Sequence, residues 1–565
     1  MKLSNKKFSG SVAARILWIW TFVLLLLPNI CLLFTERVPA GEPWARISAS
    51  FGFLLVPAAA YVALMTISRN VGKTVWTVFP LVFFSAFQMV LLDLFGCSVI
   101  AVDMWLNLVT TNASEAGELL GSMLPALMFV TMFYIPPLVM SVFAWRHDWR
   151  IGRNFVRNAR LAACACGGIG LLLLCVVLVT QPRVKVRNDM YPVNVVYNAC
   201  LAVERFEQTR NYKLTSAGFK FDARALRADS IGETYILVIG ETARSDHFQL
   251  FGYEKETTPM LMGRRGLTGF RNTLSESNTT HKSVPMLLSH LDARTFGDSV
   301  YRVKGVAEAF REAGFRTAFF SNQQRNGSFI DFFGEQADTC VFLRDNFSGP
   351  AAHGPKDKDL LALVDSELHH VKARKRLVIL HTYGSHFRYD DRYPASEEVF
   401  CVDGELEVSP HCRERLVAAY DNTIHYTASF LDMLINRLEA DSTNCISGLV
   451  YASDHGEDIY DDGTGRFLHA SPLPTVYQVG VPMLVWVSDR FRHMNPAMAG
   501  AVAENAEKGV SSTRSVFHTL LHMAGVEALP LDTTQSLLSR GYKAPQPQLY
   551  VNDHNRAVLL DEIMR

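Results

Sequence analysis

Carboxylates and imidazoles follow three strand-like runs of the sequence, at the points where those runs end. TYILVIG leads into Glu241, and GLVYAS leads into Asp454 and His455. RLVIL leads into His381 and then His386. Glu, Asp and His are zinc ligands, and in open parallel sheets ligands bind beyond the carboxyl ends of the strands. The pattern therefore predicts a metal site at one sheet edge, with a turn after Asp454 so that it can share the site with its neighbour.

The stretch SNTTHKSVPM, residues 277–286, adds two adjacent hydroxyls, those of Thr279 and Thr280. A threonine hydroxyl is a poor nucleophile until a base or a metal lowers its pKa. The stretch follows the first strand-like run, so it could reach the same edge and supply a nucleophile that is also the fourth metal ligand. A polar turn, or a glycosylation sequon at Asn278, is the alternative. These residues alone do not choose between the two threonines.

The elements that must position these side chains are short apolar runs that alternate with helical stretches. The runs are TYILVIG, TAFFSN, RLVILHTY, GLVYASD and VPMLVWVS, and the helical stretches are 303–313, 358–371, 413–438 and 512–524. Near-continuous apolar strands alternating with helices predict an α/β domain whose mostly parallel sheet is covered on both faces.

The N-terminal third has a different composition. Five apolar segments have the length of a membrane-spanning helix: 14–34, 49–67, 75–95, 123–145 and 161–180. Lys and Arg precede the first segment and lie within the loops after the second and fourth segments, whereas none occurs in 96–121. Because basic residues remain in the cytoplasm, we expect a cytoplasmic N-terminus, an uncleaved first span and an exported C-terminal domain.

Three regions are therefore expected along the chain. They are a five-helix membrane domain at 1–181, bridging helices along the membrane surface at 182–232, and a catalytic α/β domain at 233–565. A solvated linker is the alternative for the middle region. The 565 residues include 55 Lys+Arg and 55 Asp+Glu, so there is no electrostatic case for nucleic-acid binding. Cys401 and Cys412, in an exported polar loop, are the best disulfide candidates.

Six motifs occur in one order: GETAR, SNTTHKSVP, HTYGSHFRY, AAYDNTIHYT, SDHGE and LHASP. Over nearly its whole length the chain resembles the membrane-bound phosphoethanolamine transferases of Gram-negative bacteria. That family belongs to the alkaline phosphatase/sulfatase superfamily and includes the mobile colistin-resistance enzymes. The resemblance implies an inner-membrane enzyme with a periplasmic catalytic domain.

The resemblance also implies a reaction. Phosphoethanolamine would pass from phosphatidylethanolamine to lipid A or lipopolysaccharide core through a zinc-dependent phosphothreonine intermediate. We expect membrane lipids as further partners, a monomer, and resistance to polymyxin if a lipid A phosphate is masked. A phosphoglycerol transferase or sulfatase-like phosphodiesterase, or a non-enzymatic membrane sensor, is the alternative.

The resemblance chooses between the threonines. The nucleophile of the family stands five residues before the proline of a V-P pair, here Pro285, which matches Thr280. The zinc ligands match Glu241, Thr280, Asp454 and His455. His386 and His469 match histidines that hold the substrate phosphate or a second zinc, whereas His381 is expected to be structural.

Other matches concern the substrates. Asn107, Thr111 and Glu115 are spaced four apart, so they share one helix face, and the resemblance associates that face with the ethanolamine headgroup. A polar face of an interfacial helix is the alternative. Asn322, Arg325 and Lys282 are further candidates for contact with substrate.

The sequence also departs from the family. Glu276 and Met286 stand where lipid A enzymes carry cysteines, and Asn326 stands where they carry a lysine. Arg325 or Lys282 is the candidate substitute for that lysine. These departures leave the acceptor open between a lipid A phosphate and a core sugar.

Overall fold

The computed structural model describes residues 2–35, 41–95, 99–110, 124–347, 353–402, 404, 406–440, 445–463 and 465–564. The chain divides into two compact units. The first holds the apolar N-terminal helices and extends to Glu204, and the second runs from Arg205 to the C-terminus. The division falls inside the predicted bridging region, 182–232.

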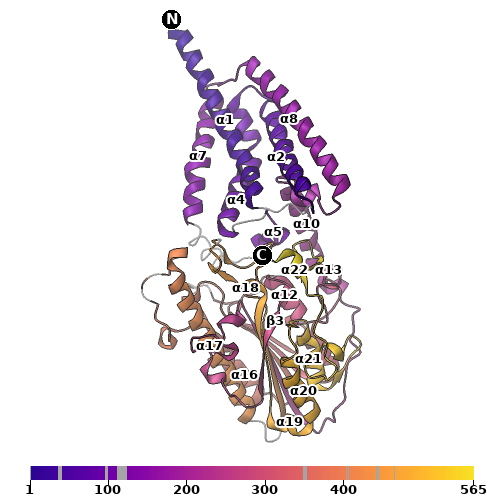
Figure 1. Ribbon diagram of the computed structural model, residues 1–565. Coiled ribbons are helices and arrows are strands. Elements are labelled where there is room, and N and C mark those ends of the chain that lie inside the picture. Colours follow the sequence, from indigo (N-terminus) through magenta and orange to yellow (C-terminus); the bar gives the residue numbers. More distant parts are fainter. Residues whose placement is uncertain are drawn as a thin grey trace. The chain divides into compact units, whose positions relative to one another are not determined.

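The helices of the first unit are the indigo to magenta ribbons of Figure 1. Four are long and apolar enough to cross a membrane: α1 (Lys2–Thr35), α2 (Pro43–Met65), α7 (Leu124–Arg146) and α8 (Arg153–Thr180). Two more, α3 (Val71–Thr77) and α4 (Phe79–Phe95), form a pair bent by 62°. The predicted five spans are confirmed if this pair counts as one.

The bend between α3 and α4 has a sequence cause. Pro80 has no N–H, so it cannot donate to the carbonyl of Trp76 four residues earlier, and the helical ladder breaks there. Farther along the chain come α5 (Val102–Thr110), α9 (Val186–Asp189), α10 (Val193–Arg210) and α11 (Tyr212–Thr215). The last three lie in the predicted bridging region. Their position along a membrane surface stays a prediction.

Polar side chains inside the first unit are paired with one another and with the backbone. The Asn29 amide donates to the carbonyls of Tyr191 and Phe53, at 2.8 and 3.2 Å. Its oxygen accepts a hydrogen bond from the Tyr61 hydroxyl at 3.3 Å. Because an unpaired buried amide is costly, these bonds tie α1 and α2 to the segment that precedes α10.

An eight-stranded sheet forms the centre of the second unit. Its strands, in spatial order, are β11 (Ser511–Ser512), β3 (Leu267–Leu274), β10 (Gly480–Val487), β7 (Cys445–Ser453), β2 (Gly232–Gly240), β6 (Lys375–His381), β4 (Arg316–Ser321) and β5 (Thr339–Phe342). Every neighbouring pair is parallel except the two pairs made by β10. The predicted mostly parallel sheet is confirmed, although β3, β5 and β11 were not predicted.

Helices cover both faces of the sheet, as its apolar strands require. The predicted helical stretches correspond to α14 (Val306–Glu312), α16 (Leu360–His369), α17 (Arg413–Ala440) and α21 (Ser515–Ala524). The helices α16 and α17 lie on one side of the sheet, and α20 (Pro496–Ala506) and α21 on the other (Figure 1). A short helix, α12 (Thr280–Leu287), begins in the SNTTHKSVPM stretch.

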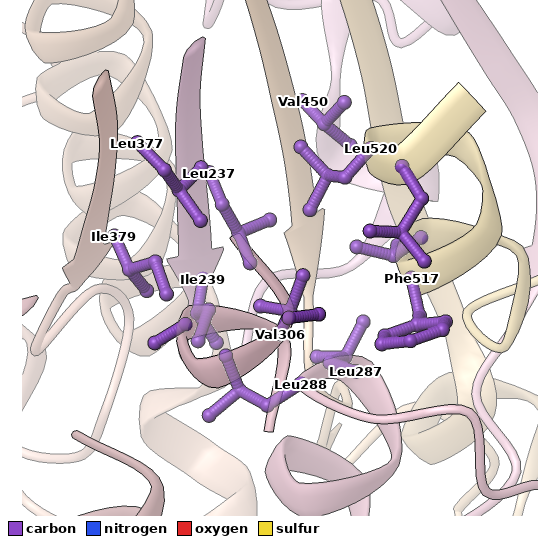
Figure 2. Close-up of a cluster of buried hydrophobic side chains, with 14 of the residues drawn as sticks. Leu237, Ile239, Leu287, Leu288, Val306, Leu377, Ile379, Val450, Phe517 and Leu520 are labelled. Atoms are coloured by element: carbon purple, nitrogen blue, oxygen red, sulfur yellow. The ribbon is translucent and has the colours of Figure 1, made fainter. Parts of the chain in front are cut away.

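The main core lies between the sheet and the helices α14 and α21 (Figure 2). Alternate residues of a strand point to one face, so Leu237 and Ile239 of β2 both face this core. They pack with Val306 of α14 and with Phe517 and Leu520 of α21, and all five side chains are fully buried. The core therefore supports β2, the strand whose end carries Glu241.

We expect Leu237→Ala to lower the free energy of unfolding of the second unit by about 2–5 kcal/mol, because it leaves a cavity beneath β2. The matched control is Leu529→Ala, since Leu529 is 76% exposed. Denaturant unfolding of the purified chain measures both variants. Equal losses would contradict this placement of the core.

Candidate metal and nucleophile site

The predicted metal ligands meet where two neighbouring strands end. The strands β2 and β7 are parallel, and Gly240 pairs with Ser453, so Glu241 and Asp454 leave the sheet side by side. The ligand atoms of Glu241, Asp454 and His455 all lie within 4.8 Å of one another, and all three side chains are buried. We call these three residues the acidic cluster.

The predicted turn after Asp454 is present. The N–H of Gly456 donates to the carbonyl of Gln478 at 2.9 Å. A Cβ atom at this position would lie 2.3 Å from the carbonyl oxygen of Tyr477, so only glycine fits. The ring Nδ1 of His455 lies 3.0 Å from the Gly456 carbonyl, to which it donates. The Nε2 atom of His455 is therefore unprotonated, as a metal ligand must be.

The carboxylate of Glu241 is aimed by its neighbours. Thr242 has a left-handed backbone (φ 60°), and its hydroxyl donates to Glu241 Oε1 at 2.8 Å. Its N–H donates to Asp454 Oδ1 at 3.2 Å. Strain of this kind persists where surrounding contacts impose it, as at functional sites. The Gln323 amide donates to Glu241 Oε2 at 3.1 Å, a contact that sequence analysis missed.

A glycine brings the HTYGSH loop against Glu241. Gly384 has a φ of 49°, and a Cβ there would lie 2.5 Å from the Glu241 carbonyl oxygen. Buried Asp357 holds this loop by accepting from the N–H groups of Tyr383 and Gly384, at 2.8 and 2.9 Å. Asn322, predicted to contact substrate, donates to the same carboxylate at 2.8 Å. Asn322 therefore supports the HTYGSH loop through Asp357.

The geometry distinguishes the two threonines. Thr280 is the first residue of α12, and its Oγ1 lies 3.0 Å from His455 Nε2 and 3.4 Å from Glu241 Oε1. The hydroxyl of Thr279 instead lies 3.1 Å from that of Ser277. Of the two adjacent threonines, Thr280 is therefore the one whose hydroxyl faces the acidic cluster, in agreement with the family match.

Hydrogen bonds hold the loop that carries Thr280. Buried Glu276 accepts from the N–H of Ala293 at 2.6 Å. The amide of Asn278 donates to the Ser471 carbonyl at 2.7 Å, and its oxygen accepts from the hydroxyl of Tyr550. Glu276 is one of the two positions where a cysteine was expected from the resemblance, and its hydrogen bond is one of these anchors.

The electrostatics of the acidic cluster suit a cation. Burial raises the pKa of Glu241, and the neighbouring Asp454 carboxylate raises it further. Burial also raises the pKa of Asp454 and lowers that of His455 well below its usual value. Two buried carboxylates repel each other, and a bound divalent cation would remove that cost. The donor set of two carboxylates, one imidazole and a hydroxyl fits zinc.

His469 lies beside the acidic cluster. Its ring centroid is 4.2 Å from that of His455, and its Nδ1 is 3.4 Å from Glu457 Oε2. Both neighbours of His469, Leu468 and Ala470, have left-handed backbones, which fixes the direction of the imidazole. Glu457 is fully buried and was not selected from the sequence, although it belongs to the SDHGE motif.

His386 lies on the same side of the site as His469. Their ring centroids are 6.0 Å apart, and burial followed by the Arg392 charge lowers the pKa of His386 to about 3. His381 is fully buried, its Nδ1 is 3.2 Å from the hydroxyl of Ser321, and burial lowers its pKa to about 3. His381 is thus placed as a core residue.

The two candidate substitutes for the family lysine point elsewhere. Arg325 forms ion pairs with Asp345 and Glu335, at 2.9 and 2.6 Å. The Lys282 ammonium is buried and donates to the carbonyl of Asn552 at 2.9 Å. Because both charges already have partners, the structure does not support the prediction that Arg325 or Lys282 binds the transferred phosphate.

The membrane-side candidates are only partly described. Asn107 belongs to α5, and Thr111 and Glu115 lie outside the described residues. Their proposed headgroup face therefore stays a prediction.

The predicted disulfide between Cys401 and Cys412 is not formed. Cys412 is a free, buried thiol immediately before α17, and its sulfur accepts a hydrogen bond from Arg415 at 2.8 Å. Cys401 is exposed. The Cys412 sulfur is engaged by Arg415 of α17 and not by Cys401.

Comparison with known proteins identifies the family of the chain. A family model described as Sulfatase matches residues 233–526. The Kdo(2)-lipid A phosphoethanolamine 7''-transferase of Escherichia coli K12 is 30% identical over 306 residues, 53% of this chain and 52% of that protein. Phosphoethanolamine transferase EptA of the same strain is 29% identical over 299 residues, 52% of this chain and 53% of that protein. The chain spans about half the length of the curated relatives it matches.

Solved structures show the same fold. The zinc complex of the C-terminal periplasmic domain of Escherichia coli EptC matches with a TM-score of 0.53 at 25% identity, covering 60% of this chain and 96% of that one. Neisseria meningitidis EptA, an integral membrane protein, matches with a TM-score of 0.70 at 19% identity, covering 93% and 98%. The second likeness includes the membrane helices.

The sheet, with carboxylates and imidazoles at its strand ends, defines a protein of the alkaline phosphatase/sulfatase superfamily. The chain belongs to the sulfatase family, whose model covers more than half of its length. The resemblance to the phosphoethanolamine transferases within that superfamily is confirmed.

Glu276 should make the stability of the protein depend on pH. Burial raises its pKa from 4.5 to about 7, so the folded state binds its proton more tightly than the unfolded state does. The contribution of Glu276 to the free energy of unfolding is therefore greatest below about pH 4.5, and it falls by about 3 kcal/mol as the pH rises to about 7. Glu276→Gln stays neutral and can still accept from Ala293.

The difference in free energy of unfolding between Glu276→Gln and the unaltered protein should therefore grow in favour of the variant between pH 5 and 7.5. Denaturant unfolding at several pH values measures it. A constant difference would show that Glu276 titrates normally.

Proposed function

We propose that this protein transfers phosphoethanolamine from phosphatidylethanolamine to lipid A or lipopolysaccharide core. It would do so in the bacterial inner membrane, with the catalytic unit in the periplasm. The observation that carries the proposal is the Thr280 hydroxyl, 3.0 Å from His455 Nε2 within the acidic cluster. The names of the relatives supply the substrate class.

The acidic cluster and Thr280 would hold one zinc ion. When bound, it would lower the pKa of the hydroxyl and stabilise charge on the transferred phosphoryl group. The zinc complex of the related EptC domain supports this choice of metal. His386 and His469 would hold the transferred phosphate or a second zinc.

The first step forms a bond between Thr280 Oγ1 and phosphorus and breaks the bond from phosphorus to the diacylglycerol oxygen. The leaving alkoxide would take up a proton from His469, and the Glu457 carboxylate, 3.4 Å from His469 Nδ1, supports this role. The Thr280 hydroxyl would give its proton to the Glu241 carboxylate, whose Oε1 lies 3.4 Å away. The products are diacylglycerol and phosphoethanolamine esterified to Thr280.

In the second step an acceptor oxygen would attack the same phosphorus, and the bond to Thr280 Oγ1 would break. The proton lost by the acceptor would pass to His469, and Thr280 would take its own proton back from Glu241, so that the site is restored. His386 is half-buried, and desolvation lowers its pKa to about 3, so that the imidazole is neutral at periplasmic pH. It can therefore accept a hydrogen bond from the acceptor hydroxyl. The headgroup face at Asn107, Thr111 and Glu115 remains part of the proposal for donor binding.

We expect Thr280→Ala to abolish release of diacylglycerol from fluorescent phosphatidylethanolamine, and Thr280→Ser to retain a measurable rate, because serine keeps the hydroxyl. Thr279→Ser is the matched control and should stay close to the unaltered enzyme. Mass spectrometry of lipopolysaccharide from cells expressing each variant identifies the acceptor. Full turnover by Thr280→Ala would eliminate the proposal.

Removal of metal should abolish the same reaction, and added zinc should restore it. Metal analysis of the purified protein should find less zinc in Asp454→Asn and His455→Ala, each of which removes one ligand. His411→Ala is the control, since His411 is exposed and lies outside the acidic cluster. Unchanged zinc content in all three variants would exclude this metal site.

A further inference from the structure

A pocket of about 510 Å³ opens on the catalytic unit beside residues that the mechanism does not use. Asp246, Tyr253, Glu254, Arg271 and Asn272 are among the residues that line it. Its volume is in the range of small-ligand sites and exceeds the needs of a single phosphoethanolamine group.

A β-bulge builds one wall. Val481 of β10 pairs with Thr273 of β3, and Met483 pairs with Phe270, so two residues of β3, Arg271 and Asn272, oppose the single residue Pro482. Proline has no N–H to donate to the ladder, and such positions in inner strands are bulges. A β-bulge changes the direction of the side chains it carries, and here Arg271 and Asn272 are both exposed.

A buried carboxylate fixes the opposite wall, residues 245–254. Asp421, which is fully buried, pairs with His247 at 2.6 Å. It also accepts from the Tyr253 hydroxyl at 3.0 Å and from Lys255 at 2.7 Å. The Tyr253 ring is thereby held in place, and the pocket is preformed.

The charges of the pocket are balanced. Asp246 is neutralised by a bidentate pair with the buried guanidinium of Arg244, at 3.0 and 2.7 Å. The remaining charged groups of the pocket are one cation, Arg271, and one anion, Glu254. Within the described part of the chain Arg271 has no hydrogen-bond or ion-pair partner. A balanced, polar pocket suits neither an acyl chain nor a polyphosphate.

We propose that this pocket binds a saccharide. Guanidinium, amide and carboxylate groups each offer paired hydrogen-bonding atoms, which match vicinal hydroxyls, and the fixed Tyr253 ring offers an apolar surface for a sugar ring. The two walls continue along the chain into the segments that carry Glu241 and Thr280. The pocket therefore holds a sugar of the acceptor, an assignment that rests on the proposed transfer function.

The test uses the full chain carrying Thr280→Ala, purified in a detergent without a sugar headgroup. The probe is a disaccharide of two glucosamine residues, titrated by saturation-transfer NMR. Because this variant cannot form the intermediate, binding is measured independently of transfer. We expect saturable binding that Arg271→Ala and Asn272→Ala each weaken about tenfold. Arg265→Ala, an exposed arginine paired with Asp489, is the matched control and should bind normally.

In the active enzyme, Arg271→Ala should raise the KM for the lipopolysaccharide acceptor about tenfold and leave diacylglycerol release in the first step unchanged. Equal binding in Arg271→Ala and Arg265→Ala, or no saturable binding, would overturn the saccharide site. A failure of the proposed function would give a different result, because the unaltered enzyme would then release no diacylglycerol.

Discussion

The structure depends on the burial of two carboxylates, Glu241 and Asp454, at the ends of adjacent parallel strands. Taking one carboxylate out of water is costly, and placing a second beside it adds repulsion. The cost is offset when a divalent cation joins them, and His455 supplies a neutral third donor. Many local features serve this arrangement: the register of β2 on β7, the left-handed backbone of Thr242, and two positions, Gly384 and Gly456, where only glycine fits.

The same constraint explains how the nucleophile loop is held. Thr280 must stay within about one hydrogen-bond length of His455 although it lies far from it in sequence. Two residues position the loop: Glu276 fixes it to Ala293, and Asn278 fixes it to the segment that carries His469. Hydrogen bonds buried from water can serve in place of disulfides, but they depend on protonation in a way that disulfides do not.

Much of this could be predicted from the sequence. Near-continuous apolar strands ending in charged residues identify both the sheet and the edge that carries its chemistry. Other features depend on contacts between distant residues. The β3 segment LTGFRNTL has too few apolar residues to stand out as a strand, and its bulge depends on Pro482 of another strand. Gln323 supports Glu241 only because β4 and β2 flank the same neighbour, β6. The partners of Arg325 and Lys282 could not be inferred from spacing, and neither could the orientation of the Cys412 sulfur.

The central claim is that the acidic cluster activates the hydroxyl of Thr280 toward the phosphorus of phosphatidylethanolamine. The most direct measurement is peptide mass spectrometry of the full chain, quenched in acid after incubation with phosphatidylethanolamine in the absence of acceptor. We expect one phosphoethanolamine group on the peptide of residues 277–286, located at Thr280 by fragmentation and absent after chelation of metal. Modification of another residue, or turnover without any modified peptide, would contradict it.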